Sequence, residues 1–317
     1  MRILLLAPTY MGLCKHIENE LIRKGHEVLF VEDKPLKFNY RFSHRHNIKI
    51  GFLNKIFKLL SKIFVDYNAY WDEKLNSIGD LKFDFLFVVN GFSYDKHLLE
   101  RLREYNRNIK TRLYLWDNLN AYDFSYIVND VDACYTLDFL DSRNVEKMQF
   151  LPAFWVDDKT IEKQEKRYDV FLIGTNHDDR YFIAKKVIEQ LDKYGFTYLI
   201  KLIDKYKKED SIITHKFYPT KEYLELMMSS QCILDTERQT QTGPTVRLIW
   251  SLALGKKIIS TNVYMKEMPF FNPEQILIID RKNPVINEDF IRQEKVFLPS
   301  EYINSLRIDN WVNIVLK

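Results

Sequence analysis

Short apolar runs alternate with segments of helical periodicity along most of the chain, and no other feature constrains the fold as strongly. Residues 3–7 form a continuous apolar run, which is typical of a strand buried on both faces of a parallel sheet. A helical stripe that includes Ile17 and Leu21 follows, and residues 27–31 form a second strand-like run. Repeated β-α-β units of this kind predict an α/β fold with parallel sheets.

The alternation occurs in two series, separated by a polar and charged segment at residues 157–167 that we interpret as a linker. We therefore predict two doubly wound, Rossmann-like domains that face each other across a cleft, with ligands at the carboxyl ends of the strands. The first domain would span residues 1–156 and the second residues 157–300. Residues 301–317 would form a C-terminal helix able to pack back on the first domain. Predicted strands occupy residues 3–7, 27–31, 85–89, 112–116, 133–137, 148–151, 170–173, 198–203, 232–234, 257–260 and 276–279.

Composition excludes several classes of protein. The chain has 317 residues, with 47 Lys and Arg against 44 Asp and Glu, and a net charge of +3 argues against general nucleic-acid binding. Its apolar runs are all shorter than the roughly 20 residues that cross a bilayer, and the N-terminus is too short for a signal peptide. Three widely spaced cysteines argue against a disulfide scaffold or structural zinc, so we expect a cytoplasmic protein.

The small net charge conceals an uneven distribution. Residues 34–65 contain eight Lys and Arg and no Asp or Glu, and apolar residues recur there at helical spacing. A basic amphipathic helix of this kind can lie on an anionic membrane surface, which would place the protein peripherally at the inner face of the membrane. Alternatively, the apolar stripe packs on the first domain and the lysines are solvated.

Residues 232–262 predict an anion site. A strand ends near Asp235, a polar loop follows, and a helix opens at Gly243 and Pro244, where proline loses no needed donor. The exposed amides and positive end of such a helix suit a diphosphate. Thr242 and Thr245 add hydroxyl donors, and Arg247 adds a forked cation. The alternative is that these residues cap the helix and that Arg247 is an ordinary surface charge.

These residues also resemble a known family. The run from Gln241 to Arg247 (QTGPTVR) and residues 253–262 (ALGKKIISTN) are similar to the signature of bacterial GT-B glycosyltransferases from surface-polysaccharide gene clusters, including capsule, exopolysaccharide and lipopolysaccharide enzymes. Residues 2–33, 113–117 (LYLWD) and 169–180 (DVFLIGTNHDDR) resemble the same family in the expected order. One departure is Trp250, because such sequences commonly carry Glu there. If that Glu binds a sugar or ribose hydroxyl in the family, this chain recognises its donor differently, or another residue such as Glu237 takes the place of that Glu.

The resemblance implies a nucleotide-sugar donor bound mainly by the second domain and a saccharide or lipid-linked saccharide acceptor bound mainly by the first. It implies no other cofactor. On the acceptor side it points to Gly12, Asn90 and Gly91. Arg180 is a second candidate phosphate ligand, or else caps its helix or pairs with Asp178 or Asp179. The implied donor-binding set is Gly174, Thr175, Asn176, Arg180, Gln241, Thr242, Gly243, Pro244, Thr245 and Arg247.

Transfer also requires a group that activates the acceptor hydroxyl. Asp117 is our first candidate for this base because it directly follows a predicted strand, although it could instead cap the next segment. His16 is a second candidate, and Asp138 and Asp141 are weaker ones. Residues 130–132 (DVD) match the DxD pattern of metal-dependent transferases, but they precede a strand, so we predict no metal site.

The sequence therefore predicts a metal-independent glycosyltransferase of the hexosyl- or deoxyhexosyltransferase class, acting on a surface glycan or a lipid-linked saccharide. The alternative is a non-catalytic GT-B-like module that binds a nucleotide or glycan in an assembly complex. A dinucleotide-dependent oxidoreductase is disfavoured because no predicted strand is followed by GxGxxG.

Overall fold

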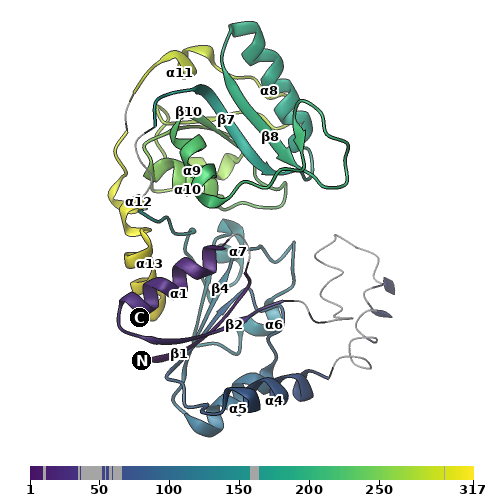
Figure 1. The fold of residues 1–317 in the computed structure, drawn as a ribbon, viewed down its shortest axis with the longest axis vertical. Helices are drawn as coiled ribbons and strands as arrows, with labels where there is room; N and C mark the ends of the chain where they lie inside the picture. The colour runs from purple at the N-terminus through teal and green to yellow at the C-terminus, as the bar shows by residue number, and fades with distance from the viewer. Residues whose placement is uncertain are drawn as a thin grey trace. The chain divides into compact units, whose positions relative to one another are not determined.

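The computed structural model describes residues 1–9, 12–34, 36, 52–53, 55–56, 59, 66–157, 164–295 and 297–317. It divides into two units, unit 1 with Met1–Leu151 and Val312–Lys317, and unit 2 with Pro152–Trp311. Each unit contains one six-stranded sheet in which neighbouring strands are parallel (Figure 1). The predicted pair of parallel α/β domains is thereby confirmed.

Unit 1 has the strand order β2-β1-β3-β4-β5-β6. Its central strand β3 is buried along its whole length, which explains its uninterrupted apolar sequence. The strands are β1 (Arg2–Ala7), β2 (Glu27–Glu32), β3 (Phe85–Val89), β4 (Lys110–Leu115), β5 (Ala133–Thr136) and β6 (Met148–Phe150). The helices are α1 (Leu13–Arg23), α4 (Tyr67–Ile78), α5 (Lys96–Tyr105), α6 (Ser125–Val128) and α7 (Phe139–Asn144).

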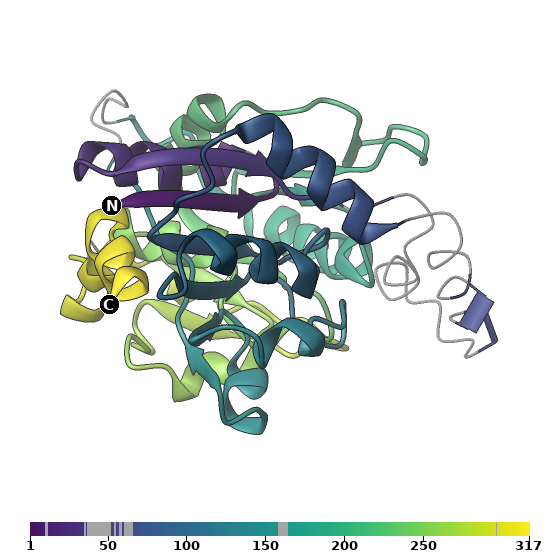
Figure 2. The same cartoon turned by 90° about the horizontal axis from the view of Figure 1, so that it is seen from below.

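Helices α4 and α5 pack against each other beside this sheet (Figures 1 and 2). The buried side chains Trp71 and Leu75 of α4 and Leu98 and Leu102 of α5 belong to one hydrophobic core with the sheet. Asp66 caps α4 by accepting bonds from the amides of its first turn. Helix α4 was not predicted from the sequence.

Unit 2 has the strand order β12-β11-β10-β7-β8-β9. Its first strand in the chain, β7, therefore lies between β8 and β10. The chain reverses its direction of winding between β7 and β10, which makes this the switch point where doubly wound sheets bind ligands. The strands are β7 (Tyr168–Thr175), β8 (Tyr198–Ile203), β9 (Ile213–Thr214), β10 (Ser230–Asp235), β11 (Lys257–Ser260) and β12 (Ile276–Ile278). The helices are α8 (Arg180–Tyr194), α9 (Thr220–Met228), α10 (Val246–Ala253), the 3-10 helix η2 (Val263–Glu267), α11 (Glu288–Arg292) and α12 (Glu301–Ser305).

Two expectations about element boundaries are wrong. Gly174 and Thr175 do not follow the first strand of unit 2 but end it, because β7 pairs with β8 as far as Thr175. The predicted single C-terminal helix is two helices, α12 and α13 (Ile308–Leu316). Backbone bonds from Trp155 to Leu306 and Ile308 break the helix between them.

The described part of the chain contains no helix that is long and apolar enough to cross a membrane. The basic stretch at residues 34–65, with its expected membrane contact, lies almost wholly outside the described residues.

Candidate functional site

The carboxyl edge of β7 and β10 in unit 2 gathers most of the predicted anion-binding residues. Helix α8 begins just after β7, and α10 begins after the loop that follows β10. Thr245 caps α10, since its hydroxyl accepts a bond from the amide of Leu248 at 3.1 Å and donates to Asp235 Oδ1 at 2.6 Å. The helix ladder starts with the bond from Ile249 N to Thr245 O, so the amides of Val246 and Arg247 have no partner within the helix.

Arg247 is buried at this edge and is not the ordinary surface charge that the sequence left open. Its side chain is 9% exposed and forms an ion pair at 3.0 Å with the buried carboxylate of Asp235. Further bonds run to the backbone oxygens of Ile173 and Thr236. Burial disfavours the charge of Arg247, but Asp235 and Tyr223 together hold the pKa of Arg247 above its usual value.

Arg180, the first residue of α8, is also buried. Its guanidinium donates to Thr175 O, to Thr236 Oγ1 and to Thr236 O, and pairs with neither Asp178 nor Asp179. All three acceptors are uncharged, and the part of the chain that the structure describes offers Arg180 no carboxylate within ion-pair distance. Burial and the neighbouring charge of Arg247 therefore lower the pKa of Arg180 to about 9.

Gly174 is the point at which the two arginines meet. A Cβ atom at this position would lie 2.9 Å from Nη1 of Arg247 and 3.0 Å from Nη1 of Arg180. Only glycine leaves room for both guanidinium groups here. Asp235 forms an ion pair with Arg247 but not with Arg180, and its Oδ2 atom has no hydrogen-bond partner.

The pKa of His177 is affected by the positive charge at this edge of the sheet. Burial lowers the pKa of its imidazole to about 2, and the charges of Arg180, Arg238, Arg247 and Arg281 add to that effect. Its Nδ1 atom is buried without a hydrogen bond. The imidazole is therefore neutral at ordinary pH, and the concentrated positive charge would favour an anion.

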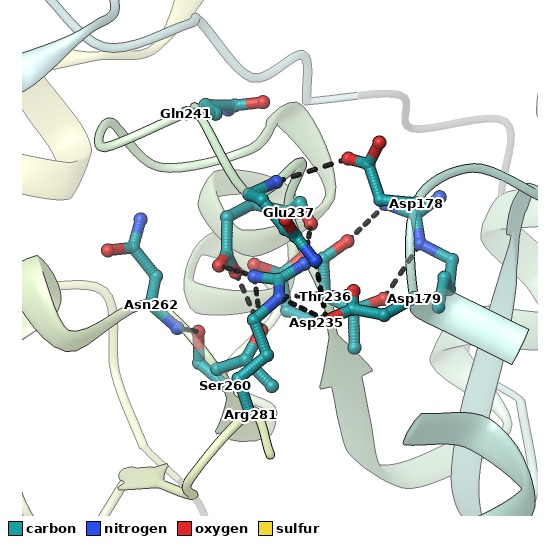
Figure 3. Close-up of polar contacts among 12 residues, drawn as sticks. Asp178, Asp179, Asp235, Thr236, Glu237, Gln241, Ser260, Asn262 and Arg281 are labelled. Atoms are coloured by element: carbon teal, nitrogen blue, oxygen red, sulfur yellow. Dashed lines mark hydrogen bonds and ion pairs between the residues drawn. The ribbon is translucent and has the colours of Figure 1, made fainter. Parts of the chain in front are cut away.

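Arg281 is a residue of this edge that the sequence analysis missed. It lies just beyond β12, and its guanidinium bridges Asp179 at the start of α8 and Glu237 at the end of β10 (Figure 3). Glu237 is buried, also accepts a bond from Thr261, and has its pKa raised by burial against the opposing charge of Arg281. The position of an arginine just after a predicted strand was the one available signal.

The loop before α10 is held from the neighbouring strand. Asn262, just after β11, donates to the carbonyl oxygens of Thr242 and Gly243. Gln241 donates to Gly243 O, and Pro244 is buried beside it. At the other end of the edge, Thr175 is exposed, and Asn176 donates to Asp204.

Trp250, the residue at which the family resemblance fails, has a structural role. It is buried in α10, and its indole nitrogen donates to Phe154 O at 2.8 Å. It therefore anchors α10 to the chain segment that precedes the linker.

In unit 1, Asn90 and Asp117 meet at the carboxyl ends of β3 and β4. Asn90 adopts a left-handed conformation with φ 63° and donates to Asp117 Oδ2 at 2.9 Å. Asp117 is partly exposed. Gly91, with φ 85°, turns the chain so that the amides of residues 91–93 all bind the carboxylate of Asp33. Asp33 was not predicted, and burial raises its pKa to about 6.

The other unit 1 candidates lie apart along the same sheet edge. Gly12 is exposed and caps α1 with φ 71°, while His16 is partly exposed on that helix. Asp138 caps α7, and Asp141 accepts the amide of Leu119 at 2.8 Å. Burial raises the pKa of Asp141 to about 6, and the charge of Asp138 adds to the rise.

In the DxD match at residues 130–132, the second carboxylate, that of Asp132, accepts hydrogen bonds from the amide and the hydroxyl of Thr111. Among the described residues, no group of three or more His, Cys, Asp or Glu is placed to hold a metal ion.

No protein-family model and no curated protein matches the chain. Among solved structures, a protein provisionally named UDP-N-acetylglucosamine 2-epimerase from Listeria monocytogenes matches with a TM-score of 0.51 and 8% identity, over 100% of this chain and 94% of that one. Arabidopsis thaliana UGT89C1 complexed with UDP matches with a TM-score of 0.49 and 8% identity, over 92% and 88%. CalG4, the calicheamicin glycosyltransferase, gives 0.42 and 12%, over 100% and 94%.

The likeness to the Listeria protein, which extends over the whole chain, shows the fold. Two Rossmann-like domains with six-stranded parallel sheets make this a protein of the GT-B fold, as the sequence predicts. At 8% identity this likeness establishes the fold alone.

Proposed function

We propose that the chain is a metal-independent glycosyltransferase that moves a hexosyl or deoxyhexosyl group from a nucleotide diphosphate sugar to a surface glycan or lipid-linked saccharide. The observation that carries the proposal is the pair of buried arginines at the switch point of unit 2. Arg247 pairs with Asp235, whereas Arg180 donates to uncharged oxygens and has no carboxylate within ion-pair distance among the described residues. Such a charge is costly unless an anion compensates it, and the diphosphate of a donor would do so.

The arrangement suggests how the two arginines act. Their bonds to the strand ends use only part of the five N–H groups of each guanidinium. The remaining N–H groups and the positive charge of the two arginines would therefore stabilise the diphosphate, while the first-turn amides of α10 contact it. The preorganised charge would favour the leaving diphosphate as the bond to the anomeric carbon breaks.

The acceptor half of the reaction would use unit 1. In this proposal Asp117 takes the proton of the acceptor hydroxyl as its oxygen bonds to the anomeric carbon. Asn90 donates to Oδ2 of Asp117 and would hold the carboxylate in place. Gly12 and Gly91 would shape the acceptor side.

Two other functions fit the same fold. A GT-B-like binding module would hold a nucleotide or glycan without catalysis, and the Listeria protein's name indicates epimerisation of a nucleotide sugar. A thermal-shift panel of nucleoside diphosphates and nucleotide sugars tests the site first, because a ligand that binds the folded state stabilises it. Incubation with the best ligand then separates the functions. Sugar transfer, or slow donor hydrolysis, supports a transferase, a recovered donor of altered configuration indicates an epimerase, and binding without turnover indicates a module.

A further inference from the structure

The loop between β10 and α10 carries a further arginine at the carboxyl edge of the unit 2 sheet, Arg238. Its side chain is half-buried, and among the residues that the structure describes it has no hydrogen bond and no carboxylate within ion-pair distance. The guanidinium groups of the other arginines at this edge are bound to protein groups, namely those of Arg180, Arg247 and Arg281. All five N–H groups of Arg238 are therefore available to a ligand.

The backbone on both sides of Arg238 is held in place. The preceding residue, Glu237, is buried. The following residue, Gln239, donates its amide to Asp178 at 3.1 Å and its side-chain nitrogen to Asp179 at 3.0 Å. The side chain of Arg238 therefore starts from a fixed point, which restricts the region that its guanidinium can reach.

Arg238 lies close to the other arginines in the folded chain. After burial, the charges of Arg180 and Arg238 lower the pKa of the His177 imidazole most, ahead of those of Arg247 and Arg281. Such an effect weakens with distance, so Arg238 belongs to the same group of charges.

Four carboxylates lie near this edge, and each already accepts a bond from another protein group. They are those of Asp178, Asp179, Asp235 and Glu237. A planar guanidinium such as that of Arg238 offers two parallel N–H groups, which match two oxygens of a phosphate. The unpaired fork of Arg238 is therefore suited to an anion that the loop and α10 approach together.

We propose that Arg238 binds the second phosphate of the diphosphate, the one that Arg180 and Arg247 do not hold, and thereby makes the site select a diphosphate over a monophosphate. The inference rests on the proposed function, because it assigns a further residue to the same anion. Arg180 and Arg247 meet at Gly174 and form one fixed centre of charge, which can compensate one phosphate group. A second phosphate needs a further cation, and Arg238 supplies it.

The test is calorimetric titration of the full chain with inorganic phosphate and with inorganic pyrophosphate. In the wild type we expect the Kd for pyrophosphate to lie about tenfold or more below that for phosphate. Arg238→Gln should raise the Kd for pyrophosphate about tenfold, through the loss of one charge-assisted interaction, and change the Kd for phosphate by less than about twofold. Arg238→Lys keeps the charge without the fork and should give an intermediate Kd. Arg180→Met should weaken the binding of both anions.

The matched control is Arg167→Gln, which removes the same charge from an exposed side chain just before β7, at the opposite end of that strand. It should change neither Kd by more than about twofold. An unchanged Kd for pyrophosphate in Arg238→Gln, an equal loss for the two anions, or the same loss in Arg167→Gln would overturn this inference alone. A wild type that binds neither anion would overturn the proposed function as well. Thermal melting checks that each variant is folded.

Discussion

Arg180 and Arg247 reach the same face of Gly174 from two different helices, with their Nη1 atoms 3.0 and 2.9 Å from the position of a Cβ atom. Like charges so close together in a buried setting repel each other, and among the described residues Asp235 lies within ion-pair distance of Arg247 but not of Arg180. The fold maintains this arrangement by satisfying the guanidinium groups with strand-end carbonyl oxygens. Such preorganised charge is expected where a protein binds an anion rather than where it only needs stability.

Gly174→Ala should disturb nucleotide binding more than stability. The new methyl group must displace at least one guanidinium, so we expect the Kd for a nucleoside diphosphate to rise about tenfold or more. The free energy of unfolding should fall by about 1 kcal/mol, because flexible side-chain ends can move. Calorimetric titration and chemical denaturation measure the two effects. Gly195→Ala is the control, since its φ of 73° makes alanine strained at the far end of α8 without touching either arginine. A Gly174→Ala protein with normal affinity would contradict the assignment.

Arg281 and Glu237 should behave as a coupled pair. Removing the guanidinium in Arg281→Ala leaves the buried carboxylate of Glu237 unpaired and should lower the free energy of unfolding by about 3 kcal/mol. Adding Glu237→Gln should recover part of that loss, because the glutamine side chain carries no charge. Denaturation of both single variants and the double variant measures the coupling. Strictly additive losses would show that the bridge between β10 and the end of β12 has no energetic role.

His177 should contribute to the pH dependence of stability. Its pKa is lowered to about 2 in the folded state by burial and four arginines, against an ordinary value of 6.5. As the pH falls below 6.5, the unfolded chain binds a proton at His177 and the folded chain does not, so stability is lost on acidification. His177→Gln should lose less stability than the wild type between about pH 6.5 and 4, with no difference above that range. NMR titration of the free protein that finds this imidazole titrating near pH 6.5 would contradict the account.

Asp117→Asn tests the proposed base. The variant keeps an oxygen to accept from Asn90 but cannot take a proton, so transfer should fall by about 10² to 10⁴-fold. The Kd for the nucleotide should not change, because Asp117 belongs to unit 1. Asp141→Asn provides a comparison at the same sheet edge, and Asp141 has its pKa raised to about 6 by burial. Normal turnover in Asp117→Asn together with loss in Asp141→Asn would move the base role to Asp141.

Much of the fold could be predicted from the sequence because parallel strands such as β3 are buried on both faces and read as continuous apolar runs. Helix α10 was also predictable, since Pro244 and the capping Thr245 mark its start. Strand order is not encoded locally. The approach of Arg180 to Arg247 depends on β7 lying beside β10, and 66 residues lie between the two arginines in the chain. Arg281 and Asp33 carry no motif, because each acts on a loop that only the folded sheet brings near.

Calorimetric titration of a nucleoside diphosphate into the wild type, Arg180→Met and Asp235→Asn tests the central claim most directly. We expect saturable binding to the wild type and its loss in Arg180→Met, although removing an uncompensated buried charge should change the stability of that variant by no more than about 1 kcal/mol. Asp235→Asn should instead lower the free energy of unfolding by about 3 kcal/mol, because it leaves the buried guanidinium of Arg247 without its carboxylate. Equal nucleotide affinity in the wild type and in a folded Arg180→Met protein would contradict the claim that the paired arginines form the anion site.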